Sequence, residues 1–468
     1  MNNTKTTKRA LLSSVLVMLI CIAMLIGTTF AWFTDSASTA VNKIQAGTLE
    51  VQLLDEDGTS LEGQTLGWVA ADGRAQDEIL WEPGCTYKLQ PIVIKNAGNL
   101  ALKYKIVITG IRGDAELNDV IEWTITNNGQ TYAVDQEVSL AANDSTTLTI
   151  SGHMKEDAGN EYQGLSIDGI GITVVATQDT VESDSFGNDY DANAEYPVPV
   201  SSVSDIKDAL AKGIGNIVLA SDVTVETPYL AITKDISIDF NGNTLRGSII
   251  STGNIFDSPN NLVLSDPNNN GEYSIYSKIY GIENGNGQAA AIIATHTTVT
   301  IESGKYTNDN AVIFCQTFDP EAVNVMINGG TFDGQGAASV IVNLSGNVII
   351  NDGEFNAYHD GERYGACVQV EPYIPYVPSI TTINGGTFNA DKSIFYVNVD
   401  TNYIQRIVVT GGTFNVAEGG NLIQVSSGNA SDYLTITGGT FNVDPTAYVD
   451  TANYNVTQSG STWTVTAK

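Results

Sequence analysis

The residues best suited to contact a ligand gather in one segment of the sequence, residues 356–378. Aromatic faces and carboxylates suit the binding of sugar rings. A proline-stiffened loop whose tyrosines pack against the rest of the fold is the alternative. The ligand-contact candidates in this segment are Tyr358, His359, Asp360, Glu362, Arg363, Tyr364, Glu371, Tyr373 and Tyr376.

Catalysis in the same segment would require clustered carboxylates and a basic residue on one face, acting as acid and base or binding calcium. Asp360 and Glu362 supply two acids. No such cluster repeats at regular spacing along the sequence. We therefore expect a binding module rather than an enzyme and assign no catalytic residue. A polysaccharide lyase or hydrolase is the alternative function.

Metal chemistry has little support in the residue types. The three histidines, His153, His296 and His359, are scattered, and no C-x-x-C pair occurs, so the spacing typical of zinc sites is missing. Residues 266–271 resemble the front half of a calcium loop, but the twelfth position is Ser277 instead of Glu. A turn is the simpler interpretation. We expect no cofactor, with calcium as the alternative.

A repeat must position the candidate segment. Each repeat places an aromatic residue after a glycine bend, and alternating apolar residues stand on both sides of it. Two or three short strands per repeat of this length predict one rung of a parallel solenoid. Segment 356–378 fills the longest interval, as solenoid insertions that bind ligands often do. The aromatic residues recur at intervals of 26, 23, 33, 26 and 27 residues: Tyr306, Phe332, Phe355, Phe388, Phe414 and Phe441.

The solenoid, expected over residues 201–468, should be a right-handed parallel β-helix with rungs about 4.8 Å apart and its aromatic rings inside. A capping helix is predicted over residues 204–213, with a serine cap and a terminal Gly213. A hairpin around Ser459-Gly460 is predicted to cover the last rung. Both caps would protect open sheet edges.

Composition agrees with an all-β chain and narrows its partners. The 468 residues carry 53 acidic and 21 basic side chains, a net charge of -32, and only 16% of them are charged. Such an acidic surface repels phosphate, which argues against nucleic-acid binding. Few charges together with 45 glycines favour strands and tight turns over helices. The length predicts at least two domains.

The first residues have the pattern of an export signal. Lys5, Lys8 and Arg9 precede an apolar run over residues 10–26, and small residues follow before an expected cleavage after Ala31. An uncleaved membrane anchor is the alternative. Cleavage of residues 1–31 would leave three cysteines at wide spacing, which is no disulfide framework. We expect buried structural thiols at Cys85, Cys315 and Cys367.

A β-sandwich is expected between the signal and the solenoid, over residues 32–179. Apolar residues alternate with smaller or polar ones along 100–108, 148–150 and 170–174, which is the period of half-buried strands. Asn127-Asn128-Gly129 predicts a tight hairpin turn. Residues 180–200, rich in acids and ending near Pro197 and Pro199, are interpreted as an exposed linker.

The N-terminal part resembles the TasA/camelysin family with its SipW-dependent signal peptides. The likeness rests on residues 10–15, 27–36, 42–51, 81–84, 94–104 and 176–178 and covers roughly the first 180 residues. It implies a Gram-positive exported protein, a SipW-type signal peptidase as partner, a jelly-roll sandwich and a relation to extracellular matrix fibres. Some relatives are described as metallo-endopeptidases, but this sequence lacks the ligand histidines for that activity.

The C-terminal part is similar to right-handed parallel β-helices of the pectate-lyase type. Together the two resemblances suggest a secreted or cell-surface structural or adhesive protein, related to biofilm matrix fibres. Its β-helix would contact glycans, matrix or host surfaces. Trp32 and Phe33, exposed by signal cleavage, are candidates for completing the sandwich of a neighbouring copy by strand addition, which would give a homopolymer.

Overall fold

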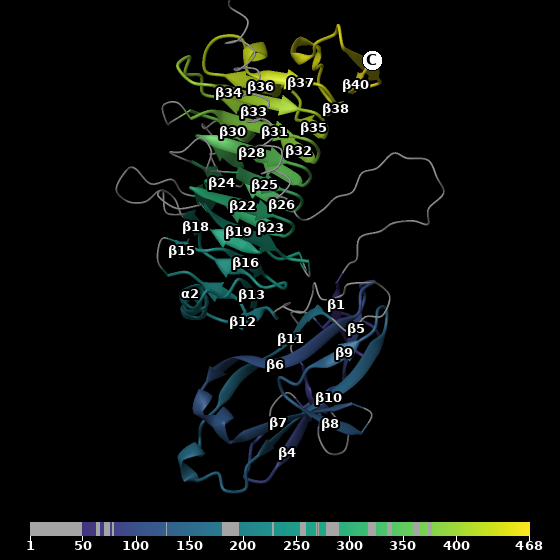
Figure 1. Cartoon of the computed structure of the whole chain (residues 1–468), viewed down its shortest axis with the longest axis vertical. Helices are drawn as coiled ribbons and strands as arrows, with labels where there is room; N and C mark the ends of the chain where they lie inside the picture. Colours follow the sequence, from purple (N-terminus) through teal and green to yellow (C-terminus); the bar gives the residue numbers. More distant parts are fainter. Residues whose placement is uncertain are drawn as a thin grey trace, which may run out of the picture. The chain divides into compact units, whose positions relative to one another are not determined.

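The structure, a computed structural model, is built almost entirely of β-strands (Figure 1). It confirms the predicted fold class, an all-β chain with an antiparallel sandwich followed by a parallel β-helix. The predicted signal peptide, its cleavage point at Ala31 and the strand-addition candidates Trp32 and Phe33 lie outside the described residues. These are 49–61, 66–69, 75–76, 79–127, 129–179, 196–226, 229–252, 259–267, 269, 271–277, 290–316, 324–334, 339–358, 365–372 and 377–468.

The sandwich has a larger and a smaller antiparallel sheet. The larger runs in the order β1, β5, β10, β4, β2, β3, with β7 pairing β10 and β8 pairing β7. Its strands are β1 (Val51–Leu54), β2 (Trp68–Val69), β3 (Ala75–Gln76), β4 (Thr86–Leu89), β5 (Ile92–Asn96), β7 (Ile121–Asn127), β8 (Gln130–Ala133) and β10 (Ser145–Met154). The smaller sheet contains β11 (Ile167–Gln178), β6 (Leu102–Gly113) and β9 (Val138–Leu140), and the 3-10 helices are η1 (Ala115–Val120) and η2 (Asn160–Tyr162).

The alternation read from the sequence explains the core of the sandwich. Leu102, Tyr104 and Ile106 on β6 are at most 2% exposed, and they share one core with Leu148 and Ile150 of β10. Every second residue therefore faces inward, as predicted. The expected hairpin is also present, because β7 and β8 pair antiparallel with Asn127 opposite Gln130.

The β-helix consists of three parallel sheets, which we call the first, second and third coil sheets. The first contains β12 (Val198–Val200), β13 (Asn216–Leu219), β16 (Ile236–Asp239), β19 (Asn260–Ser265), β22 (Thr297–Ile301), β25 (Asn324–Ile327), β28 (Gly346–Ile350), β31 (Ser379–Ile383), β34 (Gln405–Val409) and β37 (Leu434–Ile436).

From β13 to β34, each strand of the first coil sheet is followed by one strand of the second and one of the third. The second contains β14 (Val223–Thr224), β17 (Leu245–Arg246), β20 (Ile275–Ser277), β23 (Lys305–Asn308), β26 (Thr331–Gly334), β29 (Glu354–Ala357), β32 (Thr387–Ala390), β35 (Thr413–Val416), β38 (Gly439–Phe441), β40 (Thr462–Ala467) and β39 (Tyr454–Ser459). The third contains β15 (Leu230–Ile232), β18 (Ile249–Thr252), β21 (Ala290–Thr295), β24 (Ala311–Cys315), β27 (Ile341–Asn343), β30 (Ala366–Val370), β33 (Ser393–Val397) and β36 (Asn421–Val425). The short helices η4 (Ala430–Asp432) and η5 (Thr446–Tyr448) lie near the end.

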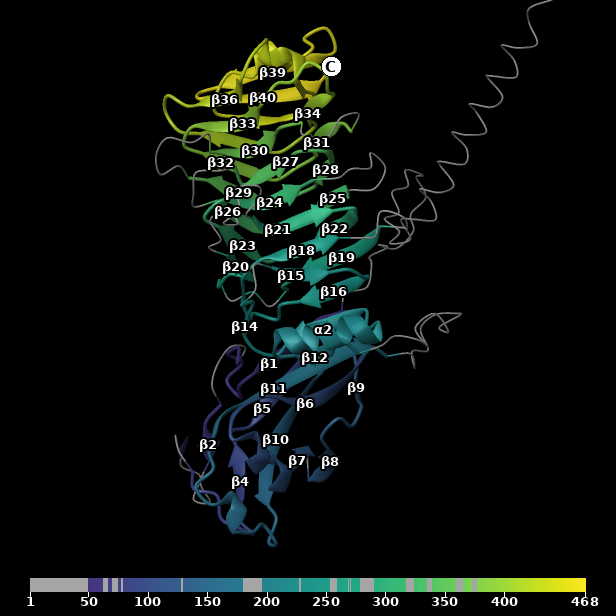
Figure 2. The same cartoon turned by 90° about the vertical axis from the view of Figure 1, so that its left-hand side faces the viewer.

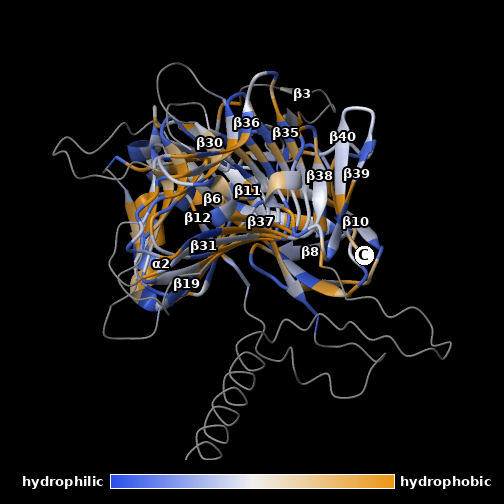
Figure 3. Ribbon diagram, turned by 90° about the horizontal axis from the view of Figure 1, so that it is seen from above, coloured by the Kyte–Doolittle hydropathy of each residue, from blue (hydrophilic) through white to orange (hydrophobic). Residues whose placement is uncertain are grey.

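The recurring aromatic residues stack inside the coil. Successive ring centroids from Tyr306 to Phe441 are 5.2, 4.9, 4.6, 4.9 and 4.8 Å apart, and none of these side chains is more than 1% exposed. These separations match the rung spacing expected of paired strands. Figure 3 colours the ribbon by hydropathy, and apolar and polar residues alternate along the strands. The predicted inward position of the aromatic residues is confirmed.

Both glycines of the repeated pair are required, for different reasons. In the repeat before Phe414, a Cβ on Gly411 would collide with the carbonyl oxygen of Asn384, one rung below. Gly412 has φ +100, a backbone conformation that other residues rarely adopt. The first glycine therefore permits close approach between rungs, and the second turns the chain from the first coil sheet into the second.

The predicted cap at the start of the coil is a helix, α2 (Val203–Lys212). Its apolar face, with Ile206, Ala209 and Leu210, packs in the same core as the first rungs, and Figure 2 shows the helix beside β12. The helix ends at Gly213, as predicted, but its serine cap is Ser202 instead of Ser204. The Ser202 hydroxyl accepts the Asp205 N–H at 3.1 Å, which fixes the start of the helix two residues earlier.

The other end of the coil carries the predicted hairpin. Strands β39 and β40 pair antiparallel, and β40 pairs antiparallel with β38, placing Trp463 opposite Phe441. Trp463, Tyr454 and Val456 pack against the end of the coil core. The hairpin therefore covers the last rung of the second coil sheet.

The predicted linker over 180–200 overlaps the first strand of the coil. Residues Val198–Val200 form β12, which pairs in parallel with β13. Extended Pro-Val-Pro backbone is compatible with an edge strand, because proline is tolerated where one side of the strand is unpaired. The β-helix thus begins before residue 201.

Candidate functional site

The repeats place two columns of side chains on the outer face of the second coil sheet. After each glycine bend the strand alternates outward, inward, outward, with the stacked aromatic residue as the inward member. The outward residue before the aromatic one forms what we call the threonine column: Lys305, Thr331, Glu354, Thr387, Thr413 and Thr440. The outward residue after it forms what we call the amide column: Arg246, Tyr276, Thr307, Asp333, Asn356, Asn389 and Asn415.

Three asparagines of the amide column form a hydrogen-bonded ladder. Asn415 Nδ2 donates to Asn389 Oδ1 at 3.0 Å, Asn389 Nδ2 to Asn356 Oδ1 at 2.8 Å, and Asn356 Nδ2 to Asp333 Oδ1 at 2.9 Å. All three amides point the same way, and the ladder ends on a carboxylate. A charged acceptor strengthens the last bond and polarises those behind it.

A second ladder lies between the first coil sheet and the glycine bend, where Asn328, Asn351 and Asn384 follow the ends of β25, β28 and β31. Asn384 donates to Asn351 at 2.9 Å and Asn351 to Asn328 at 2.8 Å, and Asn328 donates to both carboxylate oxygens of Glu302 at 3.1 Å. Thr410 adds a hydroxyl that donates to Asn384 at 2.8 Å. Stacked amides ending on an acid are thus a general device of this coil, and they hold successive rungs in register.

Aromatic and charged groups gather where the amide column meets Asp333. The Tyr273 hydroxyl donates to Asp333 Oδ2 at 3.2 Å, although the two residues are 60 positions apart in the sequence. The Lys305 ammonium lies 4.6 Å from the Tyr273 ring centroid, and the rings of Tyr273 and Tyr276 are 5.7 Å apart. We call Tyr273, Tyr276, Lys305 and Asp333 the tyrosine cluster.

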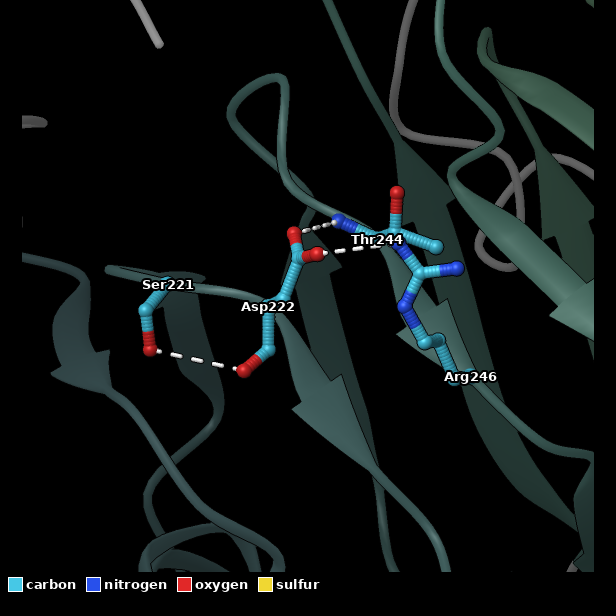
Figure 4. Close-up of polar contacts among 4 residues, drawn as sticks. All are labelled: Ser221, Asp222, Thr244 and Arg246. Atoms are coloured by element: carbon cyan, nitrogen blue, oxygen red, sulfur yellow. Dashed lines mark hydrogen bonds and ion pairs between the residues drawn. The ribbon is translucent and has the colours of Figure 1, made fainter. Parts of the chain in front are cut away.

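The first rungs of the same face carry an ion pair. Arg246 Nη2 lies 3.2 Å from Asp222 Oδ2, and Asp222 Oδ1 accepts the Thr244 N–H at 2.9 Å (Figure 4). The Arg246 and Asp222 side chains are 51% and 46% exposed. Solvent therefore screens the attraction, and the pair stabilises the fold by at most about 1 kcal/mol. The Arg246 guanidinium remains accessible to solvent at one end of the amide column.

Of the predicted ligand contacts, Tyr358 and Glu371 lie within the described residues. Tyr358 follows β29, its N–H donates to the Gly334 carbonyl, and its side chain is 56% exposed. Glu371 follows β30, where it accepts bonds from Gln369 at 2.7 Å and Asn398 at 3.0 Å. Tyr358 therefore follows a strand of the second coil sheet, and Glu371 follows a strand of the third. The remaining candidates lie outside the described residues: His359, Asp360, Glu362, Arg363, Tyr364, Tyr373 and Tyr376.

The sequence reading missed the amide column and the tyrosine cluster. A readable signal for the column was present, because an Asp or Asn follows the aromatic residue at Asp333, Asn356, Asn389 and Asn415. No comparable signal marks Tyr273, which lies outside the strands of the second coil sheet and meets Asp333 only through the winding of the coil.

The calcium-like segment at Asp266 is occupied with protein donors. The Asp266 carboxylate accepts bonds from the Gly242 N–H at 2.8 Å, the Ser274 hydroxyl at 2.5 Å and the Asn269 amide at 3.0 Å, and it is only 2% exposed. These bonds favour the turn interpretation of this segment. Within the described residues, no group of three or more His, Cys, Asp or Glu side chains is placed to hold a metal ion.

Of the three cysteines within the described residues, Cys315 and Cys367 are buried thiols, as predicted, whereas the prediction of a buried thiol at Cys85 is wrong, because Cys85 is half-buried. Burial raises the pKa of the Cys315 thiol to about 12 and raises the pKa of Cys367 as well. Cys315 aligns with Asn343 and Val370 in the two rungs above it, so Cys367 does not lie directly above Cys315. Both thiols are free and held in the protonated, unreactive form.

Comparison with protein family models, with curated proteins and with solved structures found no match to this chain. Across the described part of the chain, no helix is both long and apolar enough to span a bilayer. The outer face of the second coil sheet is the candidate site. Its rings, hydroxyls, amides and carboxylate are the groups that bind polyhydroxylated ligands.

Proposed function

We propose that this protein is a structural or adhesive protein of the cell surface or extracellular matrix, and that its β-helix binds glycan chains. The observation that carries the proposal is the shared outer face of the tyrosine cluster and the amide column. Aromatic rings offer apolar faces for the C–H side of a sugar, and the carboxylate and amides offer hydrogen bonds for its hydroxyls. One continuous face supplies both.

The rigidity of the coil supports this proposal. Strands paired on both sides and a ladder of amides hold the outward groups in place before a ligand arrives. Binding to such a face costs little ordering entropy, because the side chains are already fixed. A weak ligand such as a neutral sugar benefits from that saving.

The extracellular assignment and the relation to fibres are supported by the sequence. The basic start, the apolar run and the small residues before Ala31 support export, and the TasA-like motifs support a SipW-type peptidase as partner. Trp32 and Phe33 would then complete the sandwich of a neighbouring copy. Deleting residues 32–40 should abolish polymers seen by electron microscopy while the monomer stays folded. Unchanged fibres would remove this part of the proposal.

The glycan-binding proposal is tested with a panel of neutral and acidic polysaccharides and a pair of tyrosine variants. Tyr276→Leu removes a ring from the tyrosine cluster and should weaken binding. Tyr229→Leu, at a tyrosine that is 39% exposed and precedes the third coil sheet, is the matched control. Circular dichroism melts of both variants show whether the fold is retained. Equal affinity of the two variants for every glycan would contradict the proposed face.

The same incubations distinguish binding from cleavage. Release of reducing or unsaturated ends, lost in Asp360→Ala or Glu362→Ala, would favour the alternative function of a polysaccharide lyase or hydrolase. Binding without release favours the adhesive function. Parallel samples with and without calcium show whether the ion has a part in either outcome.

A further inference from the structure

The charge of the outer face changes along the coil. Its first rungs carry Arg246, Lys305, Asp333 and Glu354, whereas all the column members on its last rungs, β32, β35 and β38, are uncharged. These are Thr387, Thr413, Thr440, Asn389 and Asn415. Because the chain has a net charge of -32, its electrostatic field repels acidic polymers from this uncharged surface. The columns also offer no carboxylate partner to a cationic group there.

Both columns are accessible on strand β35. Thr413 and Asn415 are exposed, while Asn356, farther down the amide column, is only 6% exposed. Each ladder asparagine uses one amide hydrogen within the ladder and keeps a second donor and further acceptor capacity. Strand β35 thus presents an exposed hydroxyl and an exposed amide side by side, and β32 carries the same pair half-buried.

The spacing of these groups is set by the rungs. The rings of Phe388, Phe414 and Phe441, on the inner side of the same strands, are 4.9 and 4.8 Å apart. Because the outward residues belong to the same strands, their columns repeat at the same interval. One pyranose residue of an extended chain has a similar length, so a chain along the coil axis meets a threonine hydroxyl at β32, β35 and β38 and an amide at β32 and β35.

We infer that the ligand of this face is an uncharged, extended polysaccharide that runs along the coil axis with one sugar residue per rung over β32, β35 and β38. The inference rests on the proposed function and adds to it the class of glycan and the direction of binding. Affinity then comes from repetition, because each further sugar residue finds one more threonine hydroxyl without a new ordering cost.

A length series tests this inference with the full chain. Cello-oligosaccharides from the disaccharide to the hexasaccharide are the uncharged probe, and oligogalacturonides of the same lengths are the acidic one. Calorimetry should show affinity for the uncharged series rising about threefold to tenfold per added residue, as one net hydrogen bond provides, until the three rungs are filled. The acidic series should bind more weakly at every length.

A threonine pair supplies the matched variants. Thr413→Val removes one hydroxyl at nearly constant shape and should weaken binding of the longer uncharged oligosaccharides about threefold to tenfold. Thr435→Val, at an exposed threonine on the first coil sheet, should leave binding unchanged. Matching melting temperatures of the two variants show that the loss is local.

The outcomes separate the inference from the proposed function. Binding that does not depend on length, equal binding of the acidic series, or an unaffected Thr413→Val would overturn the inference and leave glycan binding standing. No binding to either series or to any polysaccharide of the panel would remove both.

Discussion

The rings of Phe355 and Phe388 stack at 4.6 Å with 8° between their planes, although 33 residues separate them in the sequence. Only 23 residues separate Phe332 from Phe355, and those rings also stack, at 4.9 Å. The register therefore does not depend on the length of the interval. The paired strands return each aromatic residue to the same column, whatever number of residues separates them.

The ring column should dominate the stability of the coil. Phe388→Ala leaves a cavity between two stacked rings and should lower the free energy of unfolding by about 3 to 5 kcal/mol. Urea denaturation followed by fluorescence and circular dichroism measures the change. Tyr358→Ala, at a side chain that is 56% exposed, is the control and should change stability by about 0.5 kcal/mol or less. Equal effects of the two substitutions would contradict a packed ring column.

The close approach at Gly411 should make this position intolerant of any side chain. Gly411→Ala forces a methyl group against the Asn384 carbonyl oxygen, and we expect a loss of about 1 to 3 kcal/mol in unfolding free energy. Gly215→Ala meets no atom within 4 Å and is the control. Thermal melts compare the two. A Gly411→Ala variant as stable as the control would show that the rungs can separate at the bend.

The direction of the amide ladder makes a charge substitution informative. Asn356→Asp replaces the donor to Asp333 by a second carboxylate at a position that is 6% exposed. At neutral pH the variant should lose about 1 to 3 kcal/mol of stability. As the pH falls, the new carboxyl group binds a proton that can again be donated to Asp333, so the loss should shrink. Denaturation series at several pH values check this.

The control for that experiment lies at the exposed end of the same ladder. Asn415→Asp places its carboxylate in solvent beside Asn389 and should cost less than Asn356→Asp at neutral pH. A loss in Asn356→Asp that does not depend on pH would mean that the ladder carries no charge-dependent stabilisation.

Alkaline conditions should destabilise the protein through its buried acids. Burial raises the pKa of Cys315 from 9.0 to about 12 and that of Tyr104 from 10.0 to about 12. Above the unfolded values only the unfolded chain releases these protons, so the stabilisation is complete below about pH 9 and is lost as the pH rises toward 12. Denaturation midpoints measured across this pH window follow the loss of stability. Between about pH 9 and 12, the midpoint of Cys315→Ala should fall less than that of the parent protein.

Thiol reactivity provides an independent check on burial. Cys315 and Cys367 should resist Ellman's reagent in the folded protein at pH 8 and react on unfolding, whereas the half-buried Cys85 should react first. Cys85→Ser assigns the fast phase. Rapid labelling of all described thiols in the native protein would show that the coil opens readily.

The hairpin cap should keep the coil monomeric at its end. Removing residues 450–468 uncovers strand β38 and the ring of Phe441, which now pair and pack with β40. An uncovered edge offers unpaired backbone groups to another chain, so we expect larger species by size-exclusion chromatography with light scattering. The matched change, Gln458→Lys in the exposed edge strand β39, should leave the elution volume unchanged.

Much of the coil was readable from local patterns. Alternating apolar residues, the glycine bend and the aromatic residue after it recur in each repeat, and they predicted strands, turns and the inward rings. Helix α2 and the final hairpin were also predicted, because capping and turn residues act over a few positions in the sequence. The error at the helix start was small and had a local cause, since two serines competed for the cap and Ser202 holds it.

The candidate site was harder to predict from local sequence patterns. Segment 356–378 was predicted as a binding site because its residue types suit ligand binding. Tyr358 and Glu371, however, follow strands of different coil sheets. The tyrosine cluster joins Tyr273 to Asp333 across 60 residues, and nothing near either position in the sequence indicates the other.

By itself, the sequence determined the period of the coil, the residues that face its interior and the bends between its strands, because these depend on neighbours a few positions away. Only the tertiary structure decided that Asn389 lies on Asn356 and that Tyr273 reaches Asp333. Contacts between rungs depend on the register, and the register follows from the joint pairing of many strands, with loops of unequal length absorbing the difference.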